Sequence, residues 1–199
     1  DLAYVTSIAK PDISVITAVS PERPQWAPVH AANYPTIADL AYEKATLARA
    51  LAEDGTLVLN ADDCLVMDMK KQAPSSAHVL TFGTAENATV RLISTNLRLA
   101  DTPNGALPIG LEITLAILQR TRTVYLPGVF GRSIAYGLAA SACVALALDI
   151  STEEMLEGWS HYTPLPGRAR LIPGVKGTML FDDTYNASPV SMMAALRDL

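Results

Sequence analysis

The sequence predicts an α/β fold in which helices cover a mixed sheet of parallel and antiparallel strands. Three observations support this. Half of the 199 residues are hydrophobic, which is enough to bury one sizeable core. Strand-like and helix-like segments alternate near the start of the chain, as in parallel strands joined by a crossover helix. The middle of the chain instead carries successive strand-like segments separated by short turns, which is typical of antiparallel strands.

The first segments predict a parallel crossover unit. A strand is expected over residues 13–18, where the side chains are mostly β-branched or apolar. Thr36 is an N-cap candidate for a helix that runs to about Glu53, because apolar residues recur there at helical spacing. Gly55 stands where a C-terminal glycine cap is expected. A second strand follows over residues 56–59, which completes the order strand, helix, strand.

The middle of the chain predicts an antiparallel meander attached to this sheet. Its strand-like segments are residues 78–82, 88–99, 111–118 and 121–126. Two helices should follow. Residues 133–148 are rich in Ala and Leu and predict a buried helix. Ser151 and Glu154 have the spacing of a capping box, which predicts the start of the next one.

A domain boundary is predicted in the Pro- and Gly-containing segment 163–168, so that the domains are residues 1–166 and 167–199. Beyond it, residues 177–181 predict a strand, followed by a polar loop and a helix with Ser188 as its N-cap. One strand and one helix cannot bury both faces of such a unit. The last unit is therefore expected to be incomplete.

Bulk composition argues against several classes of function. The net charge is −5, and no cluster of Lys or Arg favours a nucleic acid or an anionic membrane as partner. The longest apolar stretch, residues 106–118, contains Pro108 and Glu112 and is too short to span a bilayer as a helix. Cys64 and Cys143 have no Cys or His partner at metal-ligand spacing. We therefore expect a cytoplasmic protein without nucleic-acid or membrane partners.

The start of the chain has two features that bear on completeness. It begins at Asp1, without Met and without the features of a signal peptide. The phosphate-loop motif G-x-x-x-x-G-K-[ST] does not occur in the 199 residues. We expect a processed start or a piece of a longer protein, and a protein of this kind that uses ATP would carry its main phosphate loop outside these residues.

Two adjacent carboxylates, Asp182 and Asp183, end the last predicted strand just before a helix start. Strand alternation would send their side chains to opposite faces. A helix N-terminus offers free N–H groups and a positive dipole end, so a phosphate could lie there beside Asn186, with a carboxylate on the ribose or on a bound cation. The alternative is a solvated strand end, with Ser188 capping only its own helix.

Two cationic side chains are further candidates. Arg168, in Pro166-Gly167-Arg168, could place a bidentate guanidinium on a phosphate, or could form a surface ion pair. Lys44 lies on or near the apolar face of its helix. Because lysines are seldom buried without a partner, its side chain either extends to solvent or has a function.

The order of these segments resembles the Mur ligase family, the ATP-dependent enzymes that join amino acids or peptides to the peptidoglycan precursor. The matching landmarks are residues 11–17, Lys44, residues 54–63, residues 126–128, residues 166–168 and residues 182–189. The most specific is Asp-Asp-Thr-Tyr-Asn-Ala-Ser-Pro at 182–189. It is similar to the branch that adds D-alanyl-D-alanine to UDP-N-acetylmuramoyl tripeptide.

The resemblance implies a partial central ATP-binding domain over residues 1–166, with a mixed sheet, helices and antiparallel strands. It implies the start of a Rossmann-like C-terminal domain over residues 167–199. ATP and Mg²⁺ are the implied cofactors, and a nucleotide-linked muramoyl peptide and D-alanyl-D-alanine are the implied substrates of a monomeric enzyme. The implied reaction phosphorylates a substrate carboxylate, and the incoming amine attacks the acyl phosphate. The chain by itself is expected to be inactive.

The resemblance also implies roles for individual residues. Lys44 matches a lysine that is carbamylated in many members, where the new carboxylate helps to hold magnesium. Arg168 and Asp183 match residues that engage the nucleotide phosphates and ribose, with Asp182 and Asn186 close by.

Two departures from the family pattern leave other interpretations open. Arg23 stands where many members have a metal-binding His, and Tyr136 stands in the segment that contacts adenine, in place of Asn. Tyr136 could stack on the base or simply pack inside the fold. A related ligase with another acceptor, such as a folylpolyglutamate-like substrate, and a non-catalytic binding module both remain alternatives.

Overall fold

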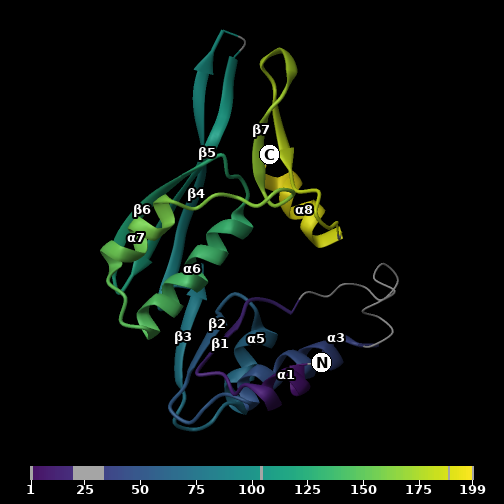
Figure 1. Ribbon diagram of the computed structural model, residues 1–199, viewed down its shortest axis with the longest axis vertical. Helices are drawn as coiled ribbons and strands as arrows, with labels where there is room; N and C mark the ends of the chain where they lie inside the picture. Colours follow the sequence, from purple (N-terminus) through teal and green to yellow (C-terminus); the bar gives the residue numbers. More distant parts are fainter. Residues whose placement is uncertain (1, 20–33, 104, 188, 199) are drawn as a thin grey trace. The chain divides into compact units, whose positions relative to one another are not determined.

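The computed structural model describes residues 2–19, 34–103, 105–187 and 189–198 (Figure 1). The chain divides into two compact units, one of Asp1–Arg91 and Ala139–Asp149, the other of Leu92–Leu138 and Ile150–Leu199. Strand β4 (Val90–Thr102) and helix α6 (Arg132–Ala147) contribute residues to both units. Within the described ranges, no helix combines the length and the apolar character needed to cross a membrane.

The first unit contains the predicted parallel crossover unit. Strands β1 (Ile13–Ile16), β2 (Thr56–Asn60) and β3 (His78–Gly83) are parallel, with β2 in the middle. Residues 57–60 of β2 are all buried, which indicates that both faces of this strand are covered. The accompanying helices are α1 (Leu2–Ile8), α3 (Ile37–Lys44), α4 (Thr46–Arg49), α5 (Cys64–Asp68) and the 3₁₀ helix η1 (Met69–Gln72). Leu57 and Leu59 pack with Val66, Ala48 and Leu51 in one hydrophobic cluster.

Helix α3 begins where the sequence predicted. The Thr36 hydroxyl accepts a hydrogen bond from the Asp39 N–H at 3.1 Å, and the Asp39 carboxylate accepts one from the Thr36 N–H at 2.9 Å. This reciprocal pair is a capping box. The predicted continuation to Glu53 is wrong. The buried Ala45 separates α3 from the short helix α4.

The predicted glycine cap at Gly55 is also wrong. Asp54 takes the left-handed backbone, with φ of 58°, whereas Gly55 does not. Gly55 instead allows a close approach of the chain, because a Cβ there would lie 2.9 Å from the carbonyl oxygen of Asp12. A backbone contact with the start of β1, rather than a helix end, accounts for this glycine.

The antiparallel part of the sheet begins later than predicted. The sheet order is β1-β2-β3-β4-β5-β6, and the start of β4 is parallel to β3 through Phe82 and Val90. The loop between them is held by Asp62, whose carboxylate accepts the N–H groups of Thr84 (2.7 Å) and Ala85 (3.0 Å). This anchoring turns the chain so that it re-enters the sheet in the same direction.

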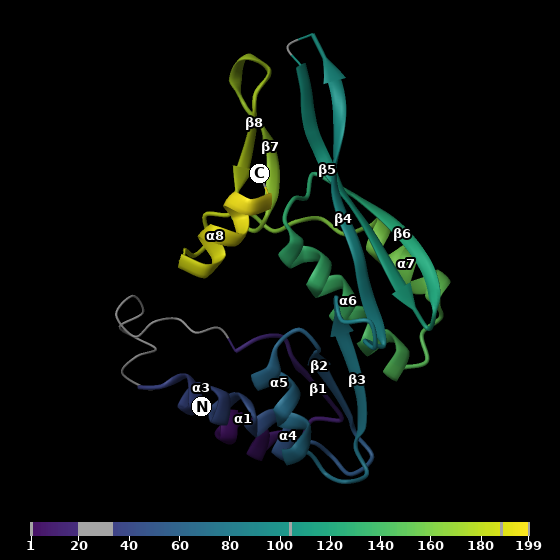
Figure 2. The ribbon, with the colours of Figure 1, turned by 180° about the vertical axis from the view of Figure 1, so that it is seen from behind.

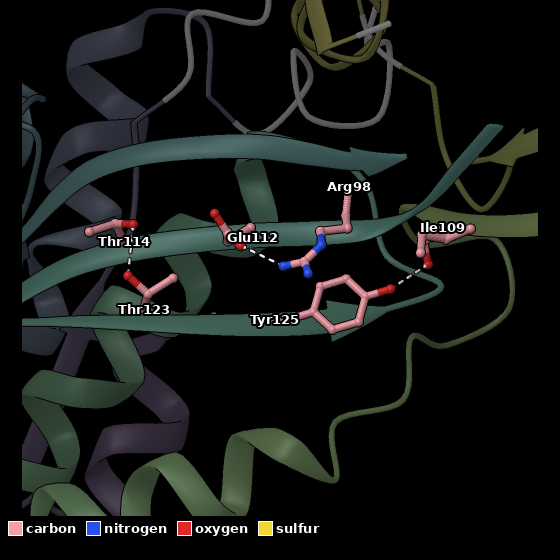
Figure 3. A network of polar contacts seen from close by, with 6 residues as sticks. All are labelled: Arg98, Ile109, Glu112, Thr114, Thr123 and Tyr125. Atoms are coloured by element: carbon pink, nitrogen blue, oxygen red, sulfur yellow. Dashed lines mark hydrogen bonds and ion pairs between the residues drawn. The ribbon is translucent and has the colours of Figure 1, made fainter. Parts of the chain in front are cut away.

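The second unit contains β5 (Gly105–Ile117) and β6 (Arg120–Pro127). These two strands come after β4 and pair with each other as a long antiparallel hairpin (Figure 2). One face of β5 is buried through Leu111, Ile113, Leu115 and Ile117, at the period of two expected for a strand. The other face is polar: Arg98 and Glu112 form an ion pair at 2.9 Å, and Thr114 lies 3.1 Å from Thr123 (Figure 3).

Helix α6 is confirmed as a helix with many buried alanines. Cys143, on this helix, is fully buried, and its Sγ donates to the Thr81 carbonyl at 3.5 Å. Burial raises the pKa of the Cys143 thiol to about 12. Cys64, at the first residue of α5, is exposed.

Helix α7 (Thr152–Ser160) packs beside β6 and starts with the predicted capping box. The Ser151 hydroxyl accepts the Glu154 N–H at 3.2 Å, and the Glu154 carboxylate accepts the Ser151 N–H at 3.1 Å. The hydrogen bonds from the Ser151 hydroxyl and N–H lower the pKa of Glu154. Both hydrogen bonds therefore favour the ionised carboxylate of Glu154.

Replacing Ser151 by alanine is expected to lower the free energy of unfolding by about 1 kcal/mol, because an N–H group of the first turn loses its partner. Ser160→Ala is the matched control. Ser160 lies at the other end of the same helix, where its exposed hydroxyl donates to the Glu157 carbonyl at 2.7 Å and lies 3.5 Å from His161 Nδ1. Urea unfolding of both variants should show a clear loss for the first and a change within about 0.5 kcal/mol for the second. Equal losses would contradict the cap.

The remainder of the second unit is a hairpin and a helix. Strands β7 (Arg170–Pro173) and β8 (Met179–Asp182) pair antiparallel around the 3₁₀ turn η2 (Val175–Gly177), and α8 spans Pro189–Asp198. Strand β7 was not predicted, whereas β8 matches the strand predicted near residues 177–181. Phe130 and Phe181 meet edge to face, with ring centroids 4.8 Å apart.

Three predictions are not tested by the structure. Ser188 and Arg23 lie outside the described residues, so the predicted N-cap and the departure at residue 23 are not examined by the structure. The domain boundary between residues 166 and 167 also stays a prediction.

Candidate functional site

Two short segments of the second unit, residues 167–170 and 182–185, are joined by hydrogen bonds. The Gly167 N–H donates to the Asp182 carboxylate at 2.9 Å, and the Ala169 N–H donates to Asp183 Oδ1 at 3.2 Å. The Tyr185 N–H donates to the Gly167 carbonyl at 3.0 Å. We call this arrangement the 167/185 clamp.

The clamp corrects the expectation that Asp182 and Asp183 point to opposite faces. Strand β8 ends at Asp182, so the alternation of a strand does not extend to Asp183. Both carboxylates instead reach backbone N–H groups of the same neighbouring segment, two residues apart.

Gly167 is required by the geometry of the clamp. Its φ is +74°, in the left-handed region that disfavours other residues. A Cβ at this position would lie 2.9 Å from the Tyr185 backbone nitrogen, which is closer than real Cβ contacts allow. The glycine therefore permits both the turn and the approach of residue 185.

Arg168 lies between the two anchored amides, so its backbone is fixed on both sides. Its guanidinium carbon lies 3.8 Å from the centroid of the Tyr185 ring, within the range of a cation–π contact. Both side chains are exposed. Among the described residues, the guanidinium forms no hydrogen bond and no ion pair, although two carboxylates are adjacent. Its donors and its charge are therefore available to an anion.

Asp182 directs both carboxylate oxygens at protein partners. Oδ1 accepts from the Thr184 hydroxyl at 2.7 Å and Oδ2 from the Gly167 N–H, with the Arg170 guanidinium 3.8 Å away. The Thr184 hydroxyl, followed by the Gly167 N–H, lowers the pKa of Asp182. Asp182 therefore anchors the clamp, and its predicted contact with a nucleotide stays a prediction.

Replacing Asp182 by asparagine tests this anchor through pH. Because the folded-state pKa lies below the ordinary value of 3.8, the unfolded chain takes up the proton first as the pH falls. The stabilisation by the carboxylate is therefore complete above about pH 4 and is lost as the pH falls through the lowered folded-state pKa. Urea unfolding from pH 7 to pH 3 should show wild type and Asp182→Asn converging toward low pH. A constant difference would contradict the ionised anchor.

Asp183 and Asn186 retain hydrogen-bonding capacity that could serve a ligand. No described residue donates a hydrogen bond to the second carboxylate oxygen of Asp183, and the Asn186 side chain is exposed in the loop after β8. Tyr136 lies half-buried on α6 in the same unit, with the Arg132 guanidinium carbon 5.7 Å from its ring centroid. The structure thus brings together Arg168, Asp182 and Asp183 in the 167/185 clamp.

Lys44 belongs to the first unit, where it is the half-buried last residue of α3. Across the described ranges, no three His, Cys, Asp or Glu side chains gather in a way that could hold a metal ion. Magnesium binding by a carbamylated Lys44 therefore stays a prediction.

The polar groups of the clamp fit a nucleotide. A guanidinium with open donors suits a phosphate, and a carboxylate oxygen without a partner suits a sugar hydroxyl. Sequence reasoning missed Tyr185, the platform for Arg168. The loop containing this tyrosine was recognised, but a contact between residues 168 and 185 leaves no signal in a single sequence.

Comparison with known proteins identifies the family. Residues 1–119, more than half of the chain, match the family described as Mur ligase middle domain. The chain belongs to the Mur ligase family. Two curated relatives illustrate the range within it. The UDP-N-acetylmuramate--L-alanine ligase of Streptomyces coelicolor is 26% identical over 169 residues, covering 84% of this chain. The UDP-N-acetylmuramoyl-tripeptide--D-alanyl-D-alanine ligase of Escherichia coli is 25% identical over 199 residues, covering all of it.

Solved Mur ligase structures share the fold. A crystal structure of MurF from Acinetobacter baumannii covers 100% of this chain with a TM-score of 0.80 and 23% identity. MurF ligase from Thermotoga maritima in complex with ADP also covers 100%, with a TM-score of 0.77 and 22% identity. The chain spans only 34% and 40% of the length of the two curated relatives and 39% and 41% of these two structures. The predicted mixed α/β Mur ligase fold is confirmed.

Proposed function

We propose that this chain is part of an ATP-dependent ligase that adds D-alanyl-D-alanine to UDP-N-acetylmuramoyl tripeptide in peptidoglycan precursor synthesis, in the cytoplasm. A carboxylate oxygen of the peptide attacks the γ-phosphorus and releases ADP. The amine of D-alanyl-D-alanine then attacks the acyl carbon and releases phosphate. The observation that carries the proposal is the 167/185 clamp, which holds an uncompensated guanidinium beside a carboxylate in a Mur ligase chain.

Residue roles follow from the clamp. Arg168 binds nucleotide phosphate and neutralises the charge that develops during transfer. Asp183 accepts a ribose hydroxyl through its second oxygen, while the first stays on the Ala169 N–H. Asn186, Asp182 and Tyr136 are proposed to lie around the nucleotide. Lys44, if carbamylated, is proposed to contribute one oxygen ligand to magnesium.

The choice of acceptor rests on the segment at residues 182–189 and on relatives of that activity. UDP-N-acetylmuramoyl-tripeptide--D-alanyl-D-alanine ligases from Escherichia coli and Haemophilus influenzae match 100% and 98% of the chain. A second candidate is a ligase that adds L-alanine to UDP-N-acetylmuramate, because relatives with that activity have similar identities. Both candidates share the acyl-phosphate chemistry and differ in acceptor and amine.

The test is a reconstituted reaction of the full-length protein with ATP and magnesium. One arm contains UDP-N-acetylmuramoyl tripeptide and D-alanyl-D-alanine, and the other contains UDP-N-acetylmuramate and L-alanine. ADP release and the product mass are measured in both. Product in the first arm only supports the proposal, and product in the second arm only supports the second candidate. ADP release in neither arm would reject both and favour a non-catalytic binding module.

A further inference from the structure

The ring of Tyr185 has no hydrophobic core to fill. It is 64% exposed, and its one described ring contact is the Arg168 guanidinium at 3.8 Å. Nothing about burial explains why a large aromatic side chain occupies this position. The contact with Arg168 is the feature that remains to be explained.

Two hydrogen bonds restrain the backbone that carries the ring. The Tyr185 N–H is tied to the Gly167 carbonyl, and the neighbouring Thr184 hydroxyl is tied to Asp182. The backbone of residue 185 is therefore fixed relative to the backbone of residue 168. A free arginine side chain samples many rotamers, and fixing one on binding costs entropy. A guanidinium that already lies on a ring carried by a restrained backbone loses less entropy on binding.

The contact with Tyr185 also leaves the N–H donors of the Arg168 guanidinium accessible. A guanidinium that lies over a ring uses its π-face, whereas its N–H donors point outward in the guanidinium plane. These in-plane donors are the groups that bind a phosphate in bidentate fashion. The two carboxylates that could compete for them instead accept the amides of Gly167 and Ala169.

We infer that Tyr185 is a positioning residue that holds the Arg168 guanidinium in the orientation that binds the nucleotide phosphates. This inference rests on the proposed function, because it takes Arg168 to be a phosphate ligand. It assigns no contact between Tyr185 and the nucleotide. The ring acts on phosphate affinity only through Arg168.

The experiment uses the full-length protein and its Tyr185→Leu, Tyr185→Phe and Arg168→Ala variants, together with the double variant Arg168→Ala/Tyr185→Leu. Calorimetry measures the Kd for ADP and for adenosine. An exposed cation–π contact corresponds to about a two- to five-fold change in affinity, which is the weakening expected for ADP with Tyr185→Leu. Tyr185→Phe, which keeps the ring, should restore wild-type affinity. Adenosine affinity should be unchanged in all variants.

The double variant shows whether the effect passes through Arg168. Tyr185→Leu should weaken ADP binding no further when Arg168 is already alanine. A nucleotide-free readout accompanies it: in arginine-labelled protein, the NMR signals of the Arg168 side chain should lose their ring-current shift in Tyr185→Leu and keep it in Tyr185→Phe.

The outcomes separate the two proposals. If Arg168→Ala weakens ADP binding but Tyr185→Leu does not, the inference fails and the proposed phosphate site stands. If Tyr185→Leu weakens adenosine as much as ADP, the ring contacts the base directly and the inference is overturned. If the wild type shows the ring-current shift but binds no ADP, the proposed function itself fails, and the inference fails with it.

Discussion

Replacing Arg168 by alanine is expected to lower kcat/KM of the full-length ligase for ATP by on the order of 10²–10³-fold. The 167/185 clamp contains two arginines, and Arg168, unlike Arg170, forms no ion pair with a described carboxylate. In the proposed site, its loss removes both hydrogen-bond donors and positive charge from the nucleotide phosphates. Steady-state ADP release at several ATP concentrations measures the effect.

The matched control is Arg98→Ala in the same unit. Arg98 also lies over a tyrosine ring, that of Tyr125 at 5.5 Å, but its charge is paired with Glu112 (Figure 3). Removal of this exposed pair should cost less than about 1 kcal/mol of stability and leave turnover unchanged. A similar loss of turnover in both variants would mean that the effect of Arg168 is not specific to the clamp.

The second large effect is expected from Gly167→Ala. Alanine in a left-handed conformation costs about 1–2 kcal/mol. Its Cβ would in addition push against the Tyr185 backbone nitrogen, which lies 2.9 Å from the ideal Cβ position. The two segments of the clamp would then separate. Because a misplacement of about 1 Å can cost 100-fold in rate, we expect kcat/KM to fall on the order of 10²-fold.

Gly128→Ala separates the steric effect from the backbone effect. Gly128 has nearly the same backbone angle, with φ of +69°, but no atom lies within 4 Å of the position of its Cβ. Both variants should lose comparable stability in urea unfolding from the backbone angle alone, whereas only Gly167→Ala should lose turnover. Wild-type turnover in Gly167→Ala would show that the close approach of residue 185 is not needed.

The elements that the sequence predicted well are those with local signals. Thr36 and Ser151 cap helices through partners three residues away, and such spacing is visible in any sequence. The buried face of β5 likewise follows from its alternating side chains. Chemistry between near neighbours in the chain was therefore sufficient for these features.

Most features that the sequence did not predict depend on contacts between residues that are far apart in the chain. Strand β7 contains Pro173 and pairs with β8 across a turn that has Lys176 in a left-handed conformation, so its own residues gave little strand signal. The break at Ala45, which is buried and keeps a helical backbone angle, has no counterpart in the helical spacing of the sequence. At the candidate site, the sequence identified the carboxylates and the arginine. It could not reveal that the carboxylates bind the amides on either side of Arg168, because 14 or 15 residues separate those partners.

The two cysteines differ in exposure, and this difference allows transient opening of the first unit to be measured. Cys64 is exposed, whereas Cys143 is sealed beneath the Thr81 carbonyl, and burial holds the pKa of its thiol near 12. Since only the thiolate reacts, an alkylating reagent at neutral pH should modify Cys64 in the folded protein and Cys143 only during transient opening. The ratio of the two alkylation rates, followed by mass spectrometry, would report how often the α6 segment of this unit opens, without any substitution in the chain.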